Sequence, residues 1–342
     1  MASGLAFFEH LARRARDWQP RIMSVQVSII FVNWNSTDYL RECIASIYEW
    51  TRSVEFELIV VDNASPDGDI DILTRQFEDL KLIKNPVNIG FGHANNLGFR
   101  HSTGKHILFL NPDTRLVSPA IDMMLMHSDT LEDAGIVGCR LLNSDLSVQS
   151  SCIQTFPTIL NQALDADLLR RRWPHSRLWG IGPLMSDCGA PAQVEVISGA
   201  CMMIRRDVFE RIGMFSEEYF MYAEDLDLCR KAVRAGCNNY YIGEASIIHY
   251  GGKSSSPQTA TVAKWRSIVK YFVKNHGYNY ALLFRGVMSV VALCRLGLIA
   301  LDSFGRSATG NSKAGASTWL KWRAILKTLL THSGTKRLPS NG

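Results

Sequence analysis

The chain lacks several patterns that would place it in common classes of protein. Its eight cysteines include no CxxC pair, which disfavours a zinc site or a disulfide framework and fits reduced cytosolic thiols. The glycine-rich segment 85–105 contains neither GxGxxG after a first strand nor GxxxxGK[ST], so neither a Rossmann dinucleotide loop nor a P-loop is supported. Residues 1–24 have no long hydrophobic core, so we expect a short amphipathic segment there and not a signal peptide.

Acidic residues are nearly absent from the last part of the chain. Residues 245–342 carry 14 Lys and Arg against the single acid Asp302, whereas residues 1–244 carry 23 basic and 31 acidic residues. A basic block of this kind binds an anionic surface, either nucleic acid or anionic lipid. The apolar content of the block favours lipid over nucleic acid.

Three segments of this basic block have the pattern of helices. Residues 264–274 and 319–330 are amphipathic and cationic, and residues 281–301 form an apolar run that Arg285 and Arg295 interrupt. We predict that the region 256–342 is helical and lies on the inner face of the cytoplasmic membrane, at the lipid interface. The alternative is that these helices pack against the rest of the chain or a second subunit, so an oligomer stays possible.

The preceding part of the chain alternates apolar runs with segments of helical pattern. With 342 residues and 46% hydrophobic content, the chain is long enough for one large α/β domain, which we place at 25–255. Repeated strand and helix predict a mostly parallel sheet with helices on both faces. Ligands of such sheets lie beyond the carboxyl ends of the strands, here residues 33–35, 62–65 and 111–113. Residues 149–193 lack periodicity and are predicted to form loops, either a substrate lid or filler.

The string FLNPDT places Asn111 and Asp113 directly after the apolar strand 106–110. At this spacing both side chains can face one side, and their oxygens suit Mg²⁺ or Mn²⁺. His249 follows another apolar run, and a neutral imidazole could complete the coordination. Taken alone, FLNPDT is better explained as an ordinary Pro-Asp turn, and His249 as an ordinary polar residue at a strand end.

A close pair of acids, Glu224 and Asp225, begins a predicted helix that ends near residue 234. Acids in the first turn of a helix often only complement its dipole. Here aromatic residues precede the pair, and the string SGACMM supplies a turn of small residues that lets a ligand approach. A carboxylate in this setting could act as a general base.

Taken together, the strings VSIIFVNWN, VVDNAS, NIGFGHANN, FLNPDT, SGACMMIRRDVFERIGMFSEEYF, AEDLDLCRKAVRAG and HYGGKSS resemble glycosyltransferase family 2. The resemblance covers about residues 25–255 and is greatest to bacterial rhamnosyltransferases of cell-surface polysaccharide synthesis. It implies an inverting enzyme of the GT-A fold, with a nucleotide-sugar donor and a lipid-linked glycan acceptor. The donor is expected to be dTDP-rhamnose. The alternative donors are a UDP-hexose and UDP-galactofuranose. A less favoured alternative is a non-catalytic protein that binds a nucleotide sugar.

The resemblance also implies roles for individual residues. Asp225 is the expected catalytic base, Glu224 orients hydroxyl groups, and Asn111 and Asp113 occupy the position of the family's DxD metal motif. Because Asn111 replaces an acid of that motif, binding of a divalent cation is expected to depend on Asp113, His249 and the donor's diphosphate. The residues predicted to bind the donor are Asn33, Asp38, Asp62, Asn63, Asn88, Asn95, Asn96, Asn111 and Asp113.

Overall fold

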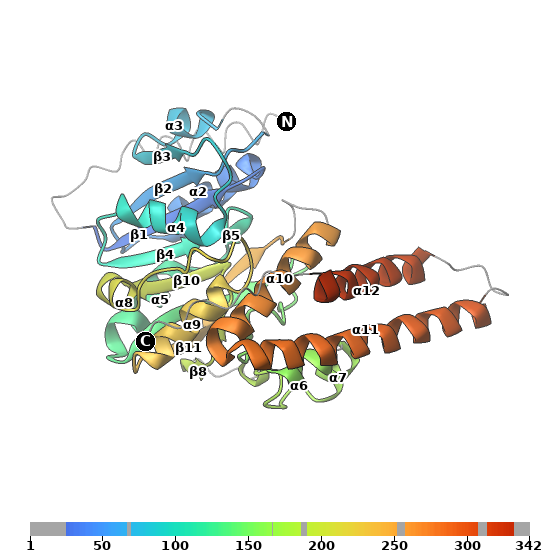
Figure 1. Cartoon of the computed structure of the whole chain (residues 1–342). Helices are drawn as coiled ribbons and strands as arrows, with labels where there is room; N and C mark the ends of the chain where they lie inside the picture. The colour runs from blue at the N-terminus through green and yellow to red at the C-terminus, as the bar shows by residue number, and fades with distance from the viewer. Residues whose placement is uncertain are drawn as a thin grey trace, which may run out of the picture. The chain divides into compact units, whose positions relative to one another are not determined.

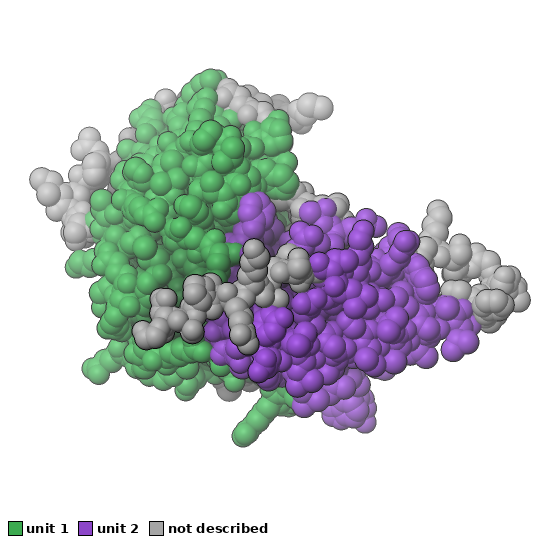
Figure 2. Space-filling view, viewed as in Figure 1, with its two compact units in different colours: residues 1–156, 174–218, 224–254 green, residues 157–173, 219–223, 255–342 purple. Residues whose placement is uncertain are grey.

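The computed structural model describes residues 25–66, 70–165, 167–185, 190–251, 257–306 and 313–331 (Figure 1). The predicted amphipathic segment 1–24 therefore lies outside the described residues. The chain divides into two compact units, coloured separately in Figure 2. Unit 1 comprises residues 1–156, 174–218 and 224–254, and unit 2 comprises residues 157–173, 219–223 and 255–342.

Unit 1 is built on a mixed sheet whose described strands run in the order β3-β2-β1-β4-β10-β6-β11-β5, with β8 paired to β11. The neighbours of β1 and β2 are parallel, as predicted, whereas β10 is antiparallel to both β4 and β6. The strands are β1 (Val27–Asn33), β2 (Phe56–Asp62), β3 (Leu80–Lys84), β4 (His106–Leu110), β5 (Thr114–Leu116), β6 (Ala134–Leu142), β8 (Ala192–Val194), β10 (Cys201–Arg205) and β11 (Asn238–His249).

Every residue of β1 and β4 is buried, which requires cover on both faces of the sheet. The helices of unit 1 are α2 (Thr37–Trp50), α3 (Ile72–Gln76), α4 (Phe91–Arg100), α5 (Ala120–Thr130), α8 (Arg206–Arg211) and α9 (Glu224–Arg234). Helix α4 packs on β1 and β2, and α5 packs on β6, β10 and β11. The predicted α/β architecture is confirmed.

Residues 149–193 contain more regular structure than their sequence predicts. They include β7 (Ile153–Gln154), which pairs with β9 (Val196–Ile197), and the short helices α6 (Ile159–Ala163), α7 (Asp167–Arg172) and Gly182–Met185. Helix α6 begins with a capping box between Thr158 and Asn161. Elements of two to six residues are too short to produce a detectable period, so the prediction of loops throughout was wrong.

Unit 2 is helical and combines α6 and α7 with α10 (Pro257–His276), α11 (Tyr278–Arg306) and α12 (Lys313–Thr331). The three long helices pack on one another. Helix α11 buries Ala281, Phe284, Met288, Ala292 and Leu296, which recur every three or four residues and form one stripe. Each of the three helices predicted in the basic region is present, with longer bounds than the sequence pattern indicated.

Glu57 on β2 ties four segments of unit 1 together. Its carboxylate accepts hydrogen bonds from Ser28 Oγ (2.6 Å), Lys81 Nζ (2.6 Å) and the Thr103 amide (2.6 Å). Burial acts to raise the pKa of Glu57, but the bonds from Lys81, Ser28 and Thr103 outweigh it and lower the pKa to about 2. The ionised carboxylate therefore stabilises the folded chain.

We expect Glu57→Gln to lower the free energy of unfolding by about 1–2 kcal/mol near neutral pH, because hydrogen bonds to a charged acceptor are lost. The pKa of Glu57 is lower in the folded chain, so its contribution is fully present above the ordinary value of 4.5 and disappears as the pH falls through about 2. Urea unfolding of both proteins at neutral pH and in this acid range measures the difference. A difference independent of pH would contradict the assignment.

Candidate active site

The carboxyl ends of β1 and β2 bring Asn33 and Asp62 together. The two residues are register partners, and Asn33 Nδ2 donates to Asp62 Oδ1 (3.0 Å) and to Ser65 Oγ (3.1 Å). Asn33 Oδ1 is buried and has no hydrogen-bond partner among the described residues. The loops after both strands contain left-handed backbone at Asn35 (φ 54°) and Ala64 (φ 62°). Strain of this kind is common at ligand sites, and the orphaned acceptor suits a donor group of a nucleotide.

Asn63 and Asn88 hold the loop that follows β3. Asn63 Nδ2 donates to Asn88 Oδ1 (2.8 Å), and Asn63 Oδ1 accepts from the Ile89 backbone amide (3.1 Å) and from Asn85 Nδ2 (3.1 Å). Asn88 Oδ1 also accepts from the Gly90 amide (2.9 Å). These bonds use the side chains within the protein, so their geometry assigns them to shaping the loop beside the sheet edge.

Asn95 and Asn96 lie on α4 and are both buried. Asn96 exchanges two hydrogen bonds with the backbone of Phe215 (2.9 and 3.0 Å) and donates a third to Glu217 (3.1 Å). The Asn96 hydrogen bond is the main cause that lowers the pKa of Glu217. Asn95 donates to the Phe91 carbonyl one turn earlier (3.1 Å). Asn96 therefore fixes the segment that precedes the acid pair to α4.

Asp38 lies in the first turn of α2, and its side chain is 90% exposed. It pairs with Arg41 three residues later (3.0 Å), as helix neighbours commonly do. Within the part of the chain that the structure describes, this pairing is the polar contact of the Asp38 side chain, so its predicted proximity to the nucleotide stays a prediction.

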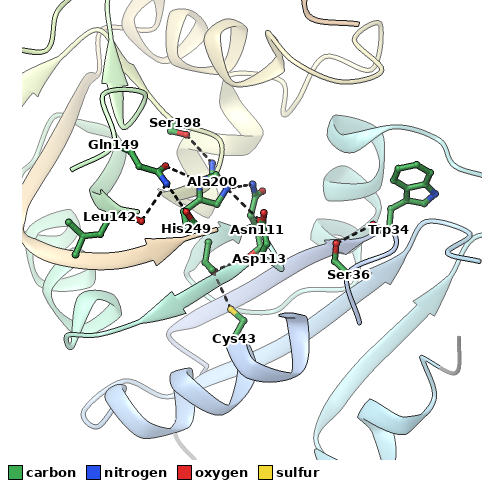
Figure 3. Close-up of polar contacts among 11 residues, drawn as sticks. Trp34, Ser36, Cys43, Asn111, Asp113, Leu142, Gln149, Ser198, Ala200 and His249 are labelled. Atoms are coloured by element: carbon green, nitrogen blue, oxygen red, sulfur yellow. Dashed lines mark hydrogen bonds and ion pairs between the residues drawn. The ribbon is translucent and has the colours of Figure 1, made fainter. Parts of the chain in front are cut away.

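Asn111 and Asp113, which follow β4, meet His249, the last residue of β11 (Figure 3). His249 Nε2 lies 3.5 Å from Asp113 Oδ1 and 3.4 Å from Asn111 Nδ2. The pairing of β11 with β5, which opposes His249 to Thr114, sets this geometry. Within the described residues no group of three or more His, Cys, Asp and Glu could hold a metal ion, so this two-residue site needs further oxygen ligands.

Gln149 holds the His249 ring through Nδ1, the ring nitrogen that does not face Asp113. Gln149 Nε2 donates to the carbonyls of His249 (2.6 Å) and Leu142 (3.4 Å), and His249 Nδ1 lies 3.0 Å from Gln149 Oε1. Because the Gln149 oxygen can only accept, Nδ1 carries the proton of the neutral ring. The Nε2 lone pair then faces Asp113, an arrangement that a cation between them would satisfy. The residues therefore fit a divalent ion.

The acid pair begins α9, and a glycine turn holds one member of it. Asp225 Oδ2 accepts from the Gly199 amide (3.1 Å), and Oδ1 accepts from the Leu226 amide (2.8 Å). A Cβ at Gly199 would lie only 3.3 Å from Asp225 Cβ, so glycine allows this close approach. Glu224 is buried, and the chain enters α9 through two left-handed residues, Tyr222 (φ 67°) and Ala223 (φ 68°).

The turn 198–200 links the acid pair to the predicted metal residues within unit 1. Gly199 bonds Asp225, and the carbonyl of the next residue, Ala200, accepts from the Asn111 amide (3.0 Å). Strand β10 begins directly after this turn, with Cys201 opposite Leu110 of β4. The structure therefore brings Asp225, Asn111, Asp113 and His249 to one edge of the sheet, next to the strand ends that carry Asn33 and Asp62.

Sequence reasoning did not identify Gln149 or Gly199 as individual site residues. Gln149 begins the segment interpreted as loops, and it lies 100 residues from His249 in the chain. No local pattern relates the two positions. Gly199 belongs to the small-residue string before the acid pair, which was the available signal.

Comparisons with known proteins show which family the chain resembles. The family described as Glycosyl transferase family 2 matches residues 28–213. The chain is 25% identical over 300 residues to the N-acetylglucosaminyl-diphospho-decaprenol L-rhamnosyltransferase of Mycobacterium tuberculosis, covering 83% of this chain and 96% of the relative. It is 24% identical over 264 residues to the rhamnosyltransferase WbbL of Escherichia coli, covering 72% of this chain and 93% of the relative.

Among solved structures, the mannosyltransferase PcManGT of Pyrobaculum calidifontis, in complex with GDP-Man and Mn²⁺, has a TM-score of 0.56. The likeness covers 96% of this chain and 94% of that chain at 16% sequence identity, so it bears on the fold. The family match spans more than half of the sequence. The chain is therefore a glycosyltransferase with the GT-A fold and belongs to glycosyl transferase family 2.

Proposed function

We propose that this enzyme is an inverting transferase that moves L-rhamnose from dTDP-rhamnose to a hydroxyl of a lipid-linked or growing cell-surface glycan. The chain matches the Mycobacterium tuberculosis and Escherichia coli relatives over nearly their whole length, and both names support the sugar. The name of the Mycobacterium tuberculosis relative also supports the lipid-linked acceptor. The observation that carries the proposal is the meeting of Asp225 with Asn111, Asp113 and His249 at one sheet edge.

The proposed reaction is a single displacement. Asp225 deprotonates the acceptor hydroxyl, the oxygen attacks the anomeric carbon from the opposite face to the diphosphate, and the diphosphate leaves with inversion. The amides of Gly199 and Leu226 hold the Asp225 carboxylate in place, so its position is set before the acceptor binds. Buried Glu224, the preceding residue, orients hydroxyl groups of the acceptor or donor.

Asp113 and His249 are the groups that would hold Mg²⁺ or Mn²⁺ together with the donor's diphosphate. Asn111 turns its amide nitrogen toward His249 (3.4 Å), so its oxygen would join them only after the amide flips. A bound divalent cation supplies positive charge against the negative charge that grows on the leaving diphosphate. Gln149 contributes by keeping the His249 ring in the tautomer that a metal ligand requires.

The test is incubation of the protein with a panel of nucleotide sugars and a bacterial membrane lipid extract, followed by mass spectrometry of the lipid products. Addition of a deoxyhexose from dTDP-rhamnose is the expected result. Transfer only from a UDP-hexose or UDP-galactofuranose would replace the proposed donor. Absence of both transfer and donor hydrolysis with every sugar would favour a non-catalytic binding protein.

We also propose that unit 2 binds the inner face of the cytoplasmic membrane. One described helix, residues Tyr278–Asp302 of α11, has the length and apolar composition of a membrane span, and 17% of its most apolar window is buried. Arg285 donates to the Leu329 carbonyl (2.8 Å) and Arg295 to the Asp165 carbonyl (3.1 Å), so both arginines bond within the unit. The outer face of α11 exposes Leu282, Leu283, Val290, Leu293, Leu298 and Leu301, which we call the α11 leucine face. An apolar face beside cationic helices suits the lipid interface.

Replacing Leu283 and Leu298 of the α11 leucine face by Glu is expected to lower partition to vesicles of phosphatidylcholine and phosphatidylglycerol by about tenfold or more, because apolar area is lost and negative charge added. Flotation of the protein with these vesicles measures the effect. Met126→Glu on α5 is the matched control, since Met126 is 51% exposed but lies in unit 1. Equal partition of the two variants would contradict the proposed membrane surface.

A further inference from the structure

Unit 2 contains a cavity of about 250 Å³ whose lining residues all belong to this unit. Three cationic side chains line it, one from each of the long helices: Lys264 of α10, Arg295 of α11 and Lys321 of α12. Three aromatic side chains line it as well: Tyr222, Trp265 and Trp322. Neither the predicted catalytic residues nor those predicted to bind the donor contribute to this cavity.

The charge of the cavity favours an anion. The single lining acid, Asp165, has its carboxylate 2.8 Å from the Arg170 Nε atom, so a neighbouring cation offsets its charge. The Arg295 guanidinium is held by its bond to the Asp165 carbonyl (3.1 Å) and lies 4.5 Å from the centre of the Trp322 ring. A guanidinium has five N–H donors, so this fixed group keeps capacity for a phosphate.

The apolar part of the cavity indicates that the anion carries a hydrocarbon group. Two tryptophans and Ile325 form apolar walls, which a free phosphate would not use. Leu298, which belongs to the α11 leucine face, lies three residues after Arg295 and is therefore its neighbour on the helix. The cavity is smaller than the roughly 300–1,000 Å³ of sites that enclose a drug-sized ligand, so it suits a head group whose chain lies outside.

We propose that this cavity binds the diphosphate of a polyprenyl-linked acceptor, the group that joins the glycan to its lipid. The inference rests on the proposed function, which supplies a lipid-linked acceptor. Lys264, Lys321 and Arg295 bind the phosphate oxygens, and the tryptophans contact the first carbons of the chain. Tyr222 lines the cavity and lies three residues before Asp225 in the sequence, which connects the cavity wall to the proposed base through the chain.

The test compares two double charge reversals of equal net charge. Lys264→Glu with Lys321→Glu changes the cavity, and Arg266→Glu with Lys327→Glu changes exposed cations of the same two helices outside its lining. Binding of farnesyl diphosphate is measured by calorimetry without any donor sugar. The cavity variant is expected to lose about tenfold or more in affinity while the control stays within about twofold of the unaltered protein.

Further binding measurements identify which phosphate compound the cavity binds. Inorganic pyrophosphate is expected to bind the unaltered protein at least about tenfold more weakly than farnesyl diphosphate, because it lacks the hydrocarbon group. Equal affinity for the two would overturn the lipid assignment. A cavity variant that loses vesicle partition but keeps farnesyl diphosphate affinity would assign the cavity to phospholipid head groups. Equal losses of farnesyl diphosphate affinity in both double variants would mean that the basic surface attracts the ligand in general and that the cavity is not its site.

These measurements separate the inference from the proposed function. Farnesyl diphosphate binding requires neither the sugar nor the catalytic acid, so it can be positive even if no rhamnose is transferred. Conversely, if the unaltered protein transfers sugar to a lipid acceptor and the cavity variant retains its KM for that acceptor, the cavity proposal fails while the function stands.

Discussion

Replacing Asp225 by Asn is expected to lower the rate of sugar transfer by about a thousandfold, while the affinity for the nucleotide sugar changes by less than about threefold. The amide cannot accept the proton of the acceptor hydroxyl, so the displacement loses its base. The residues proposed to bind the donor, at the ends of β1, β2 and β4, are unchanged. Single-turnover transfer and calorimetric donor binding, measured on the same preparation, separate the two effects.

The contacts of Asp225 show what the variant keeps and loses. Both carboxylate oxygens accept amide hydrogens, from Gly199 (3.1 Å) and Leu226 (2.8 Å), and Asn can satisfy one of the two. A small loss of stability is therefore expected beside the large loss of rate. Asp207→Asn on α8 is the matched control, because the Asp207 side chain is 69% exposed and pairs only loosely with Arg205 (3.7 Å).

Full transfer by the Asp225→Asn protein would remove Asp225 as the base. Equal loss of transfer and of donor binding would instead assign Asp225 a structural role at the turn 198–200. Glu224→Gln distinguishes the two acids, since an orienting residue should raise the KM for the acceptor more than it lowers kcat. A larger loss of kcat in the Glu224 variant than in the Asp225 variant would reverse their proposed roles.

Half of the sheet edge could be predicted because its strands are apolar and parallel. Strands β1, β2 and β4 are parallel neighbours, so the polar residues after each run were expected together, and Asn33 does oppose Asp62. The acid pair and His249 reach the same edge through β10 and β11, which pair antiparallel with distant strands. The residue types suggested His249 as a further ligand of the Asn111 and Asp113 site, but not the strand pairing that brings it there, because local periodicity contains no information on long-range pairing.

Asparagine was the least informative residue type. Its side chain both donates and accepts, so the same residue can bind a ligand, cap a loop or join two segments. In the structure Asn63, Asn88 and Asn96 bond chiefly to the protein's own backbone and to one another, whereas Asn33 keeps a buried acceptor. Unit 2 shows a similar limit, since no sequence pattern relates residues 157–173 and 219–223 to the C-terminal helices with which they pack.

Asp113→Ala is expected to weaken Mn²⁺-supported binding of dTDP by about tenfold to a hundredfold, and to leave the weaker binding measured in EDTA unchanged. Asp113 is the acidic member of the pair with His249, at 3.5 Å, and Asn111, which stands in the place of a second acid, brings no charge. Calorimetry with and without Mn²⁺ measures the affinity for the nucleotide independently of sugar transfer.

Gln149→Leu tests the same site through a residue that touches neither the cation nor the nucleotide. Without the Gln149 oxygen, the His249 ring can rotate, and the proton of the neutral ring can lie on Nε2. The Mn²⁺-supported affinity for dTDP should therefore fall by about tenfold, as in Asp113→Ala. Asp145→Asn, on the exposed turn just before Gln149, is the control and should behave as the unaltered protein. If Asp113→Ala and Gln149→Leu both leave the Mn²⁺ dependence intact, the cation is held by the diphosphate alone, and the His249 geometry serves only to join β11 to the sheet edge.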